Sequence, residues 1–334
     1  MFFKDREEYE RYLQKNEVEE YTFGQENYFN WTDDGYIKLE NNKFLKSNKD
    51  VSQYTNCMGW CLLSDGKTMV LIKRPFGDIY RDLSLENYYK AIYNNIVLPQ
   101  VAKQFQVSSA IYYLAQKDNK GKRKGYEPIY IVTKDFKDKD EELIHGEVIL
   151  EENESDINEL NINQLVDNIM TYLERNGYTN ANREQIRREF IKQSFFNRFV
   201  KQVDENNHNW ALLVDEFDKT ARMAPVYDLD CCCEIGKRGN HIRKTDDGSS
   251  VSLEAFIYQY KDEKWFKKYV AEIIESFDIE KSFLDARQET NFDMPEEYKD
   301  KYRDYFAFRR RELQEAYNKV YVENMEKREI LEQR

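Results

Sequence analysis

The first third of the chain carries short apolar runs separated by turn residues, a pattern typical of β-strands. The runs at 58–63 and 68–73 are separated by Ser-Asp-Gly-Lys. An Asp-Gly step between two apolar runs predicts a β-hairpin. Further strands are predicted at 109–115 and 129–133, and short ones within 23–50. The strand-rich part therefore ends near residue 136. The acid-rich segment 137–160 that follows shows no clear period, apart from a short apolar run around Val148.

Helical periodicity dominates the rest of the chain. An amphipathic pattern over 83–105 predicts a helix among the strands, with a kink or a break at Pro99. Asn182 is a candidate N-cap for a helix that extends to about residue 202. A second hairpin is predicted over 210–223. The other predicted helices cover 4–16, 162–175, 252–260, 263–276, 280–288 and 295–332. Strands followed by helices predict an α+β fold.

Composition and charge restrict the function. The chain is 40% hydrophobic and 34% charged, which indicates a soluble globular protein, and its net charge of −12 argues against broad binding to nucleic acid or to anionic membranes. No apolar run approaches the length of a membrane span, and the first residues lack an apolar leader segment, so we expect a cytoplasmic protein, with a secreted effector left open. The five cysteines, three of them consecutive at 231–233, favour buried packing over a disulfide framework or zinc site.

Two acidic loops flank the predicted hairpin at 210–223. Asp204 and Asn209 stand five residues apart before it, and Asp228 follows it. Phosphoryl transfer requires a cation for the nucleotide phosphates, oxygen ligands for Mg²⁺ and a carboxylate near the attacking hydroxyl. Lys73 ends the predicted strand MVLIK, so the chain offers a lysine, a D-x-x-x-x-N pair and a later aspartate in the order that kinases use. Lys67 and Asp230 are the rival lysine and aspartate.

The two loops carry a resemblance to a known family. FFNRFVKQVDENNHNWALL and MAPVYDLD resemble the catalytic loop and the metal loop of the HipA-like Ser/Thr kinases. LPQVAKQFQVSSAIYYLA and YIVTKDF are similar to that family's helix-then-strand passage and interlobe hinge. The resemblance covers roughly residues 55–275 and implies a bilobal protein-kinase-like fold. The implied lobes are 1–136, strand-rich with an N-terminal extension, and 137–334, mainly helical.

The resemblance also implies ATP with Mg²⁺ and phosphorylation of a protein hydroxyl. It makes Asp204 the catalytic base with His208 as an orienting group, and Asn209 and Asp228 the metal ligands. The implied nucleotide-binding residues are Lys73, Gly59, Thr133, Asp135 and Phe136.

Three positions depart from the family pattern. Asn206 stands where the family usually has histidine. Asn94 and Asn95 occupy the region where a helix glutamate would pair with Lys73, and the segment around Gly59 is poor in glycine.

Two other functions stay open from the sequence. A small-molecule phosphotransferase would use the same base, Asn and Asp, with Asp246, Asp247 and Glu254 as an acidic pocket for a cationic substrate. A non-catalytic kinase-fold binding protein would explain the three departures. The expected partner is a protein substrate of unknown identity, without nucleic acid or membrane; an antitoxin-like or regulatory partner is also left open.

Overall fold

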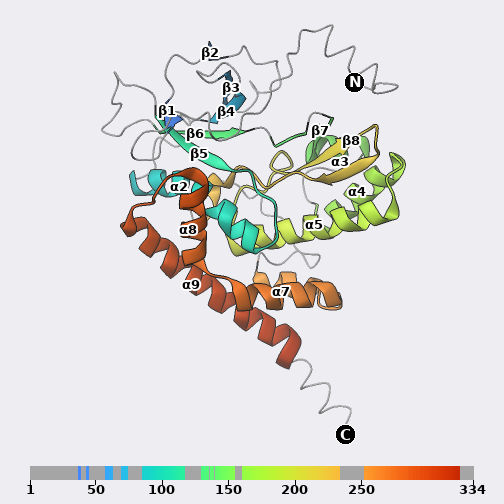
Figure 1. Cartoon of the computed structure of the whole chain (residues 1–334). Helices are drawn as coiled ribbons and strands as arrows, with labels where there is room; N and C mark the ends of the chain where they lie inside the picture. The colour runs from blue at the N-terminus through green and yellow to red at the C-terminus, as the bar shows by residue number, and fades with distance from the viewer. Residues whose placement is uncertain are drawn as a thin grey trace.

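A six-stranded sheet lies over helices at one end of the molecule, and a three-stranded sheet with its own helices lies at the other (Figure 1). The computed structural model describes residues 37–38, 43–44, 57–62, 69–73, 85–116, 129–134, 136–138, 140–154, 160–233 and 252–323. The helix expected over 4–16 lies outside these residues. Within them, helices predominate and both sheets are small, so the predicted α+β class is confirmed.

The six-stranded sheet has the order β1-β5-β6-β4-β3-β2. Its strands are β1 (Ile37–Lys38), β2 (Lys43–Phe44), β3 (Cys57–Leu62), β4 (Met69–Lys73), β5 (Tyr112–Gln116) and β6 (Ile129–Lys134). The Asp-Gly hairpin is confirmed, because β3 and β4 pair antiparallel with Trp60 opposite Leu71. On its other side β4 pairs with β6, which places Lys73 opposite Ile131. Lys73 therefore ends a strand in the interior of the sheet.

Helix α2 (Leu85–Gln104) lies beneath this sheet and continues unbroken through Pro99, so the predicted break is wrong. A proline inside a helix costs about 3 kcal/mol. Each large apolar side chain that is buried contributes about 1.5–3 kcal/mol. Leu98 and Val101, beside the proline, are fully buried, and α2 packs on β5 and on α8 (Ile279–Thr290). Tertiary packing therefore outweighs the local preference of Pro99.

The acid-rich segment after residue 137, for which the sequence showed no clear period, forms regular structure. Strand β7 (Glu142–His145) pairs with β8 (Ala211–Asp215), which pairs with β9 (Thr220–Met223) as the predicted second hairpin. Helix α3 (Gly146–Glu152) follows β7 directly. A Cβ atom at Gly146 would overlap the Trp210 ring, so glycine is required where α3 begins. This close contact joins α3 to the start of β8.

The predicted helices of the second half are present, and residues 324–332 of the last predicted helix lie outside the described residues. They are α4 (Ile162–Arg175), α5 (Asn180–Phe199), α6 (Leu253–Gln259), α7 (Lys264–Ser276), α8 and α9 (Glu296–Asn318), which continues as a π-turn over Lys319–Glu323. The N-cap expected at Asn182 is wrong. Thr179 caps α5 by accepting from Asn182 N, while the Asn182 side chain bonds the backbone of Ala221 in β9.

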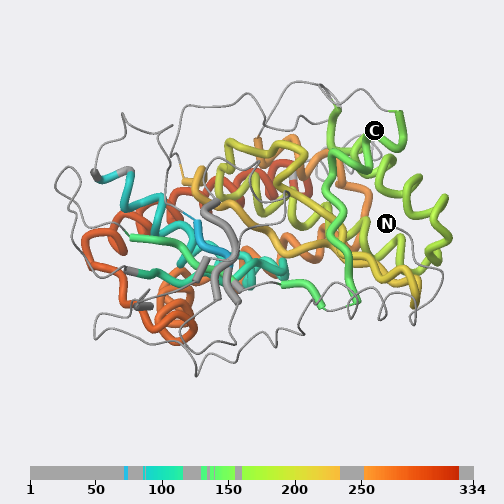
Figure 2. The backbone as a smooth tube through the Cα atoms, turned by 90° about the horizontal axis from the view of Figure 1, so that it is seen from above, coloured from blue at the N-terminus to red at the C-terminus, as the bar shows by residue number. Residues whose placement is uncertain are grey.

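The helices meet in an aromatic core. Phe195 and Phe199 of α5 contact Phe105 after α2, Phe256 of α6 and Phe306 of α9. Seen from above, α2, α8 and the six-stranded sheet occupy one end, and α4, α5 and the β7–β9 sheet the other (Figure 2). In the described part of the chain, no helix has the length and apolar character needed to cross a bilayer.

Candidate functional site

Lys73 brings the end of β4 to the loop that follows β9. Its ammonium donates to Asp228 Oδ1, and Lys73 Nζ lies 3.0 Å from Asp230 Oδ2. The lysine side chain is 15% exposed, so this is a largely buried cluster of one cation and two carboxylates. The sequence predicted that Lys73 and Asp228 would act together; it offered Asp230 only as a rival to Asp228.

Burial and charge act in opposite directions on this cluster. Burial by itself would lower the pKa of the Lys73 ammonium, but Asp228 and Asp230 together raise that pKa well above its usual value. Burial raises the pKa of the Asp230 carboxyl, against the opposing pull of Lys73. Burial likewise raises the pKa of Tyr112, whose hydroxyl accepts from Asp228 N at 3.2 Å. Lys73 therefore stays charged.

Asp228 has a left-handed backbone, with φ 57° and ψ 53°. Left-handed residues other than glycine cost about 1–2 kcal/mol, and aspartate is among those that tolerate the conformation best. The surroundings hold it there, since Asp228 N bonds Tyr112 and its carbonyl oxygen accepts from Gln202 Nε2 at 2.9 Å. In this left-handed conformation the Asp228 carboxylate contacts Lys73.

The loop that begins at Asp204 is ordered by its own side-chain hydrogen bonds. Asn206 Nδ2 donates to Asp204 Oδ1 at 2.9 Å, and Asn209 Nδ2 donates to the Asp204 carbonyl at 2.8 Å. His208 N in turn donates to Asn206 Oδ1 at 2.9 Å. Asn206 therefore orients the Asp204 carboxylate from the position where the family usually has histidine.

Gln202 joins the two acidic loops, a role that sequence reasoning missed. Its buried side chain donates to the Asp228 carbonyl at 2.9 Å and accepts from Asp204 N at 3.3 Å. Val203 N donates to the Cys231 carbonyl at 3.1 Å, which adds a backbone link. One buried amide thus holds both loops at the same site.

Glu205, next to Asp204, has a structural role in the loop. It is buried with Arg198 at the end of α5, with 3.0 Å between Glu205 Oε2 and Arg198 Nη1. An ion pair with side chains 0% and 1% exposed is a fixed support of the loop. The cysteine run behind Asp228 also packs inward as predicted, because Cys232 and Cys233 are buried.

Two histidines lie close together beside the Asp204 loop, although nothing in the sequence indicated a role for His145. His145 Nδ1 lies 3.2 Å from the His208 carbonyl, and the Tyr227 hydroxyl donates to that same carbonyl at 2.6 Å. The His208 ring faces α3, with Nε2 3.2 Å from Glu147 Oε2. His208 thus belongs to a polar cluster that supports the loop, and its orienting role stays a prediction.

The predicted nucleotide-binding residues are spread over the adjoining strands. Thr133 Oγ1 donates to the Ile111 carbonyl at 2.8 Å and so joins β6 to the start of β5. Phe136 stacks on Tyr227, with ring centroids 6.0 Å apart, and its carbonyl accepts from Arg222 Nη2 at 3.1 Å. Gly59 lies in β3 opposite Ile72, beside a shift in strand register. Asp135 lies outside the described residues, as does the rival Lys67.

The oxygen donors at the site suit a hard divalent cation. Among the described residues, no three or more His, Cys, Asp or Glu side chains gather as a metal site. Kinase-type Mg²⁺ binding does not need such a group, because one Asp, one Asn and the nucleotide phosphates supply the ligands. The Asp228 carboxylate, 34% exposed, and the Asn209 amide are the two predicted ligands, and they have those two types of oxygen.

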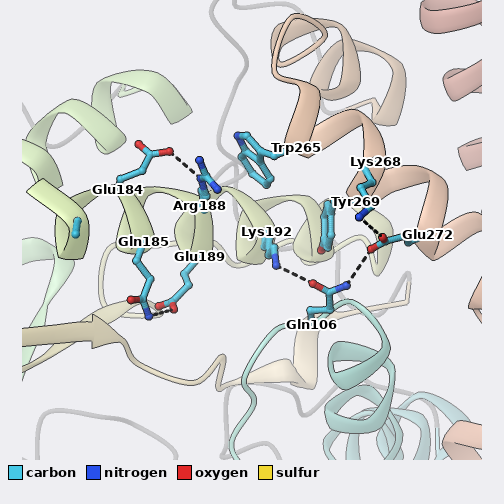
Figure 3. Close-up of a pocket in the computed structure, with 11 residues that line it drawn as sticks. Gln106, Glu184, Gln185, Arg188, Glu189, Lys192, Trp265, Lys268, Tyr269 and Glu272 are labelled. Carbon is cyan, nitrogen blue, oxygen red and sulfur yellow. Dashed lines mark hydrogen bonds and ion pairs between the residues drawn. The ribbon is translucent and has the colours of Figure 1, made fainter.

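A surface hollow of about 550 Å³ lies elsewhere, between α5 and α7 (Figure 3). Its polar side chains pair with one another. The pairs are Glu184 with Arg188, Gln185 with Glu189, Lys192 with Gln106, and Glu272 with both Gln106 and Lys268. A hollow whose polar side chains already pair with one another offers little to an ionic ligand.

Comparison with known proteins shows the fold. No family model and no curated protein matches the sequence. Among solved structures, the chain is similar to the Helicobacter pylori proinflammatory kinase CtkA, with a TM-score of 0.61 and 15% identity over 85% of this chain and 97% of that one. It also matches HipA of a Shewanella oneidensis toxin–antitoxin system, solved with HipB and operator DNA, with a TM-score of 0.45 and 10% identity over 75% of this chain and 58% of that one. The first likeness confirms the resemblance to HipA-like kinases at the level of the fold: this chain has a kinase-like fold.

Proposed function

We propose that this protein is an ATP- and Mg²⁺-dependent kinase that phosphorylates a Ser or Thr hydroxyl of a protein. The observation that carries the proposal is the contact of Lys73 with Asp228, on a loop that Gln202 ties to Asp204. These contacts support one shared site for the lysine, the proposed metal-binding aspartate and the proposed base, as phosphoryl transfer requires. The proposed nucleotide lies between a strand-rich lobe, 1–136, and a helical lobe, 137–334.

Each residue has a separate task in the proposed reaction. Lys73 binds the α- and β-phosphates, and Asp228 and Asn209 hold Mg²⁺, which neutralises charge on the phosphates. Asp204, oriented by Asn206, accepts the proton of the substrate hydroxyl as its oxygen bonds the γ-phosphorus. The bond from the γ-phosphorus to the β–γ bridging oxygen breaks, and ADP leaves with those electrons.

The neighbouring strands supply the proposed nucleotide surface. The backbone near Thr133, Asp135 and Phe136 contacts adenine, and β3 near Gly59 covers the phosphates. Arg222 of β9 supports this hinge, because its guanidinium binds Glu141 through two oxygens, each at 2.6 Å, as well as the Phe136 carbonyl. A fixed hinge favours one orientation of the nucleotide.

Of the three acids that a small-molecule phosphotransferase would use, the structure describes one, and that one is paired with a lysine. The acidic pocket that a small-molecule phosphotransferase would use includes Glu254, whose carboxylate pairs with Lys319 at 2.6 Å. The other two acids of that pocket, Asp246 and Asp247, lie outside the described residues.

The test is transfer of labelled phosphate from ATP in the presence of Mg²⁺. We expect label on the chain itself or on an added protein mixture, at Ser or Thr by mass spectrometry. Asp204→Asn, which keeps an oxygen for Asn206, should lower the rate about 10²–10⁴-fold. Asp228→Asn should remove the Mg²⁺ response. Asp304→Asn, on the exposed face of α9, is the matched control and should behave as wild type.

The outcomes separate the three functions. Transfer that survives in both Asp204→Asn and Asp228→Asn would contradict the assigned site. Label on small molecules in competition with protein would indicate the small-molecule enzyme. Thermal stabilisation by ATP and Mg²⁺ without any transfer over long incubation would indicate the non-catalytic binding protein.

A further inference from the structure

Among the residues that the structure describes, no helix glutamate contacts Lys73 in the way that kinases provide. In protein kinases the nucleotide-binding lysine is held by a glutamate of the helix that packs beside it. Here α2 presents Asn94 and Asn95 to the site, both fully buried. Glu86, the acidic residue in the first turn of α2, is exposed and pairs with Lys301 of α9 at 2.8 Å. Glu86 is therefore not the missing partner.

Asp230 occupies the space between Lys73 and α2. It lies in the short helical turn Leu229–Cys231, two residues after Asp228, and is 3% exposed. Its Oδ2 lies 3.0 Å from Lys73 Nζ, and its Oδ1 accepts from Asn95 Nδ2 at 2.5 Å. One carboxylate oxygen thus faces the lysine and the other faces the helix.

The two carboxylates that contact Lys73 differ in their exposure to solvent. The side chain of Asp228 is 34% exposed, so a cation can reach it, whereas that of Asp230 is 5% exposed. Both oxygens of Asp230 are engaged, one by Lys73 and one by Asn95. A carboxylate bound from both sides is a poor candidate for Mg²⁺ and a good fixed partner for the lysine.

Burying this carboxylate requires the surrounding hydrogen bonds. A buried ion pair repays its desolvation cost only where the remaining polar atoms are also satisfied. Asn94 Nδ2 donates to the carbonyls of Asp230, at 3.2 Å, and Cys232, at 3.1 Å, so α2 also holds the backbone around the carboxylate. These bonds fix Asp230 relative to α2.

We propose that Asp230 is the positioning residue that holds Lys73 toward the nucleotide phosphates, with Asn95 as its anchor on α2. Asp230 takes the place of the helix glutamate and leaves Asp228 to the metal. The inference rests on the proposed function, because it assumes that Lys73 binds ATP. It also accounts for the asparagines of α2, since an asparagine donates to an aspartate that a glutamate would repel.

The test is the dissociation constant of ATP with Mg²⁺, measured by titration calorimetry on the full chain. Asp230→Asn removes the charge and should weaken ATP binding at least tenfold. Asn95→Asp in that background returns a carboxylate across the same hydrogen bond and should recover part of the loss. Asn95→Ala removes only the anchor and should give an intermediate loss. Asp304→Asn is again the control.

Steady-state kinetics add a readout that loss of fold would not produce. Asp230→Asn should raise the KM for ATP more than it lowers kcat, whereas Asp204→Asn lowers kcat. Wild-type ATP affinity in Asp230→Asn, or in Asn95→Ala where Asp230→Asn does not fold, overturns the inference. The absence of recovery in the double variant, with the fold intact, also overturns it.

The experiments distinguish a failure of the proposed function from a failure of the Asp230 inference. A wild-type chain that binds ATP and transfers no phosphate contradicts the function, while its variants still test Asp230. A wild-type chain that transfers phosphate, with Asp230→Asn binding ATP equally well, contradicts the Asp230 inference alone. A chain that does not bind ATP contradicts both.

Discussion

His145 is a partly buried titratable side chain beside the Asp204 loop. Burial lowers its pKa below the ordinary 6.5, although its bond to the His208 carbonyl opposes that shift. His208 also lowers the pKa by charge repulsion, and Glu147 raises it. The net effect is that the folded protein takes up this proton less readily than the unfolded chain does.

The lowered pKa of His145 predicts a loss of stability in acid. Above about pH 6.5 both states hold His145 neutral, so its full contribution is present. As the pH falls below that value the unfolded state binds the proton first, and the free energy of unfolding decreases. Urea denaturation at pH 7, 6 and 5 should therefore show a smaller acid-dependent loss for His145→Asn than for wild type. Equal losses in the two proteins would contradict the assignment.

At the scale of single residues, the sequence identified the candidate site residues better than it identified the side chains that contact them. The spacing and order of Lys73, Asp204, Asn209 and Asp228 predicted one shared site, and the structure brings the lysine to the last aspartate. The contacts of Asp230 were not predictable from the sequence, because its hydrogen-bond partner Asn95 lies 135 residues away along the chain. Which amides face which carboxylates depends on the folded loops, and spacing along the chain does not reveal it.

At the scale of elements, local signals located most boundaries. The Asp-Gly step and the polar turn after β8 predicted both hairpins, and α4 ends before Asn176 and Gly177 as expected. Local reasoning was wrong about a break at Pro99 and about the cap at Asn182, and it found no pattern in β7 and α3. In each case the local structure depends on a contact between segments that are distant in the sequence. These contacts are the packing of α2 on α8, the bond from Asn182 to β9, and the pairing of β7 with β8.

The junction of α5 with the Asp204 loop depends on the buried Arg198–Glu205 pair. Removing one partner leaves an uncompensated buried charge, which costs about 3–5 kcal/mol. We expect Arg198→Met or Glu205→Leu to lower the free energy of unfolding by about that amount in urea titrations. The double variant, with no buried charge, should lose less than either single variant. A Glu205→Leu protein as stable as wild type would show that the pair does not hold the loop.

At the scale of the molecule, the order of strands and the meeting of helices were beyond the sequence. The sheet order β1-β5-β6-β4-β3-β2 brings together strands that are distant along the chain. In the sequence of α9, Tyr298, Tyr302 and Leu313 form part of an apolar stripe, and all three side chains are buried in the structure. The sequence does not show which elements this stripe packs against. The start of α9 contacts α2 at Tyr298 and Tyr302, whereas the helix otherwise packs mainly on α6, α7 and α8. Tyr302 connects α9 to the Lys73 cluster through hydrogen bonds.

Tyr302 is the point of that connection. Its hydroxyl donates to Asn94 Oδ1 at 2.7 Å, and Asn94 in turn holds the carbonyls of Asp230 and Cys232. Tyr302→Phe deletes this hydroxyl, which also lies 3.1 Å from the Lys90 carbonyl as a second acceptor, so we expect a loss of about 1 kcal/mol in stability. Because the bond also orients Asn94, the dissociation constant of ATP should rise several-fold.

Tyr298→Phe is the matched control on the same face of α9. The Tyr298 ring packs on Tyr93 at a centroid distance of 4.8 Å, a contact that the loss of its hydroxyl leaves in place. Calorimetry should therefore show weaker ATP binding for Tyr302→Phe alone. Equal ATP affinities in the two variants would mean that α9 supports the fold of α2 without acting on the nucleotide site. Weaker ATP binding in Tyr302→Phe alone would show that α9 helps to hold Asp230 in contact with Lys73.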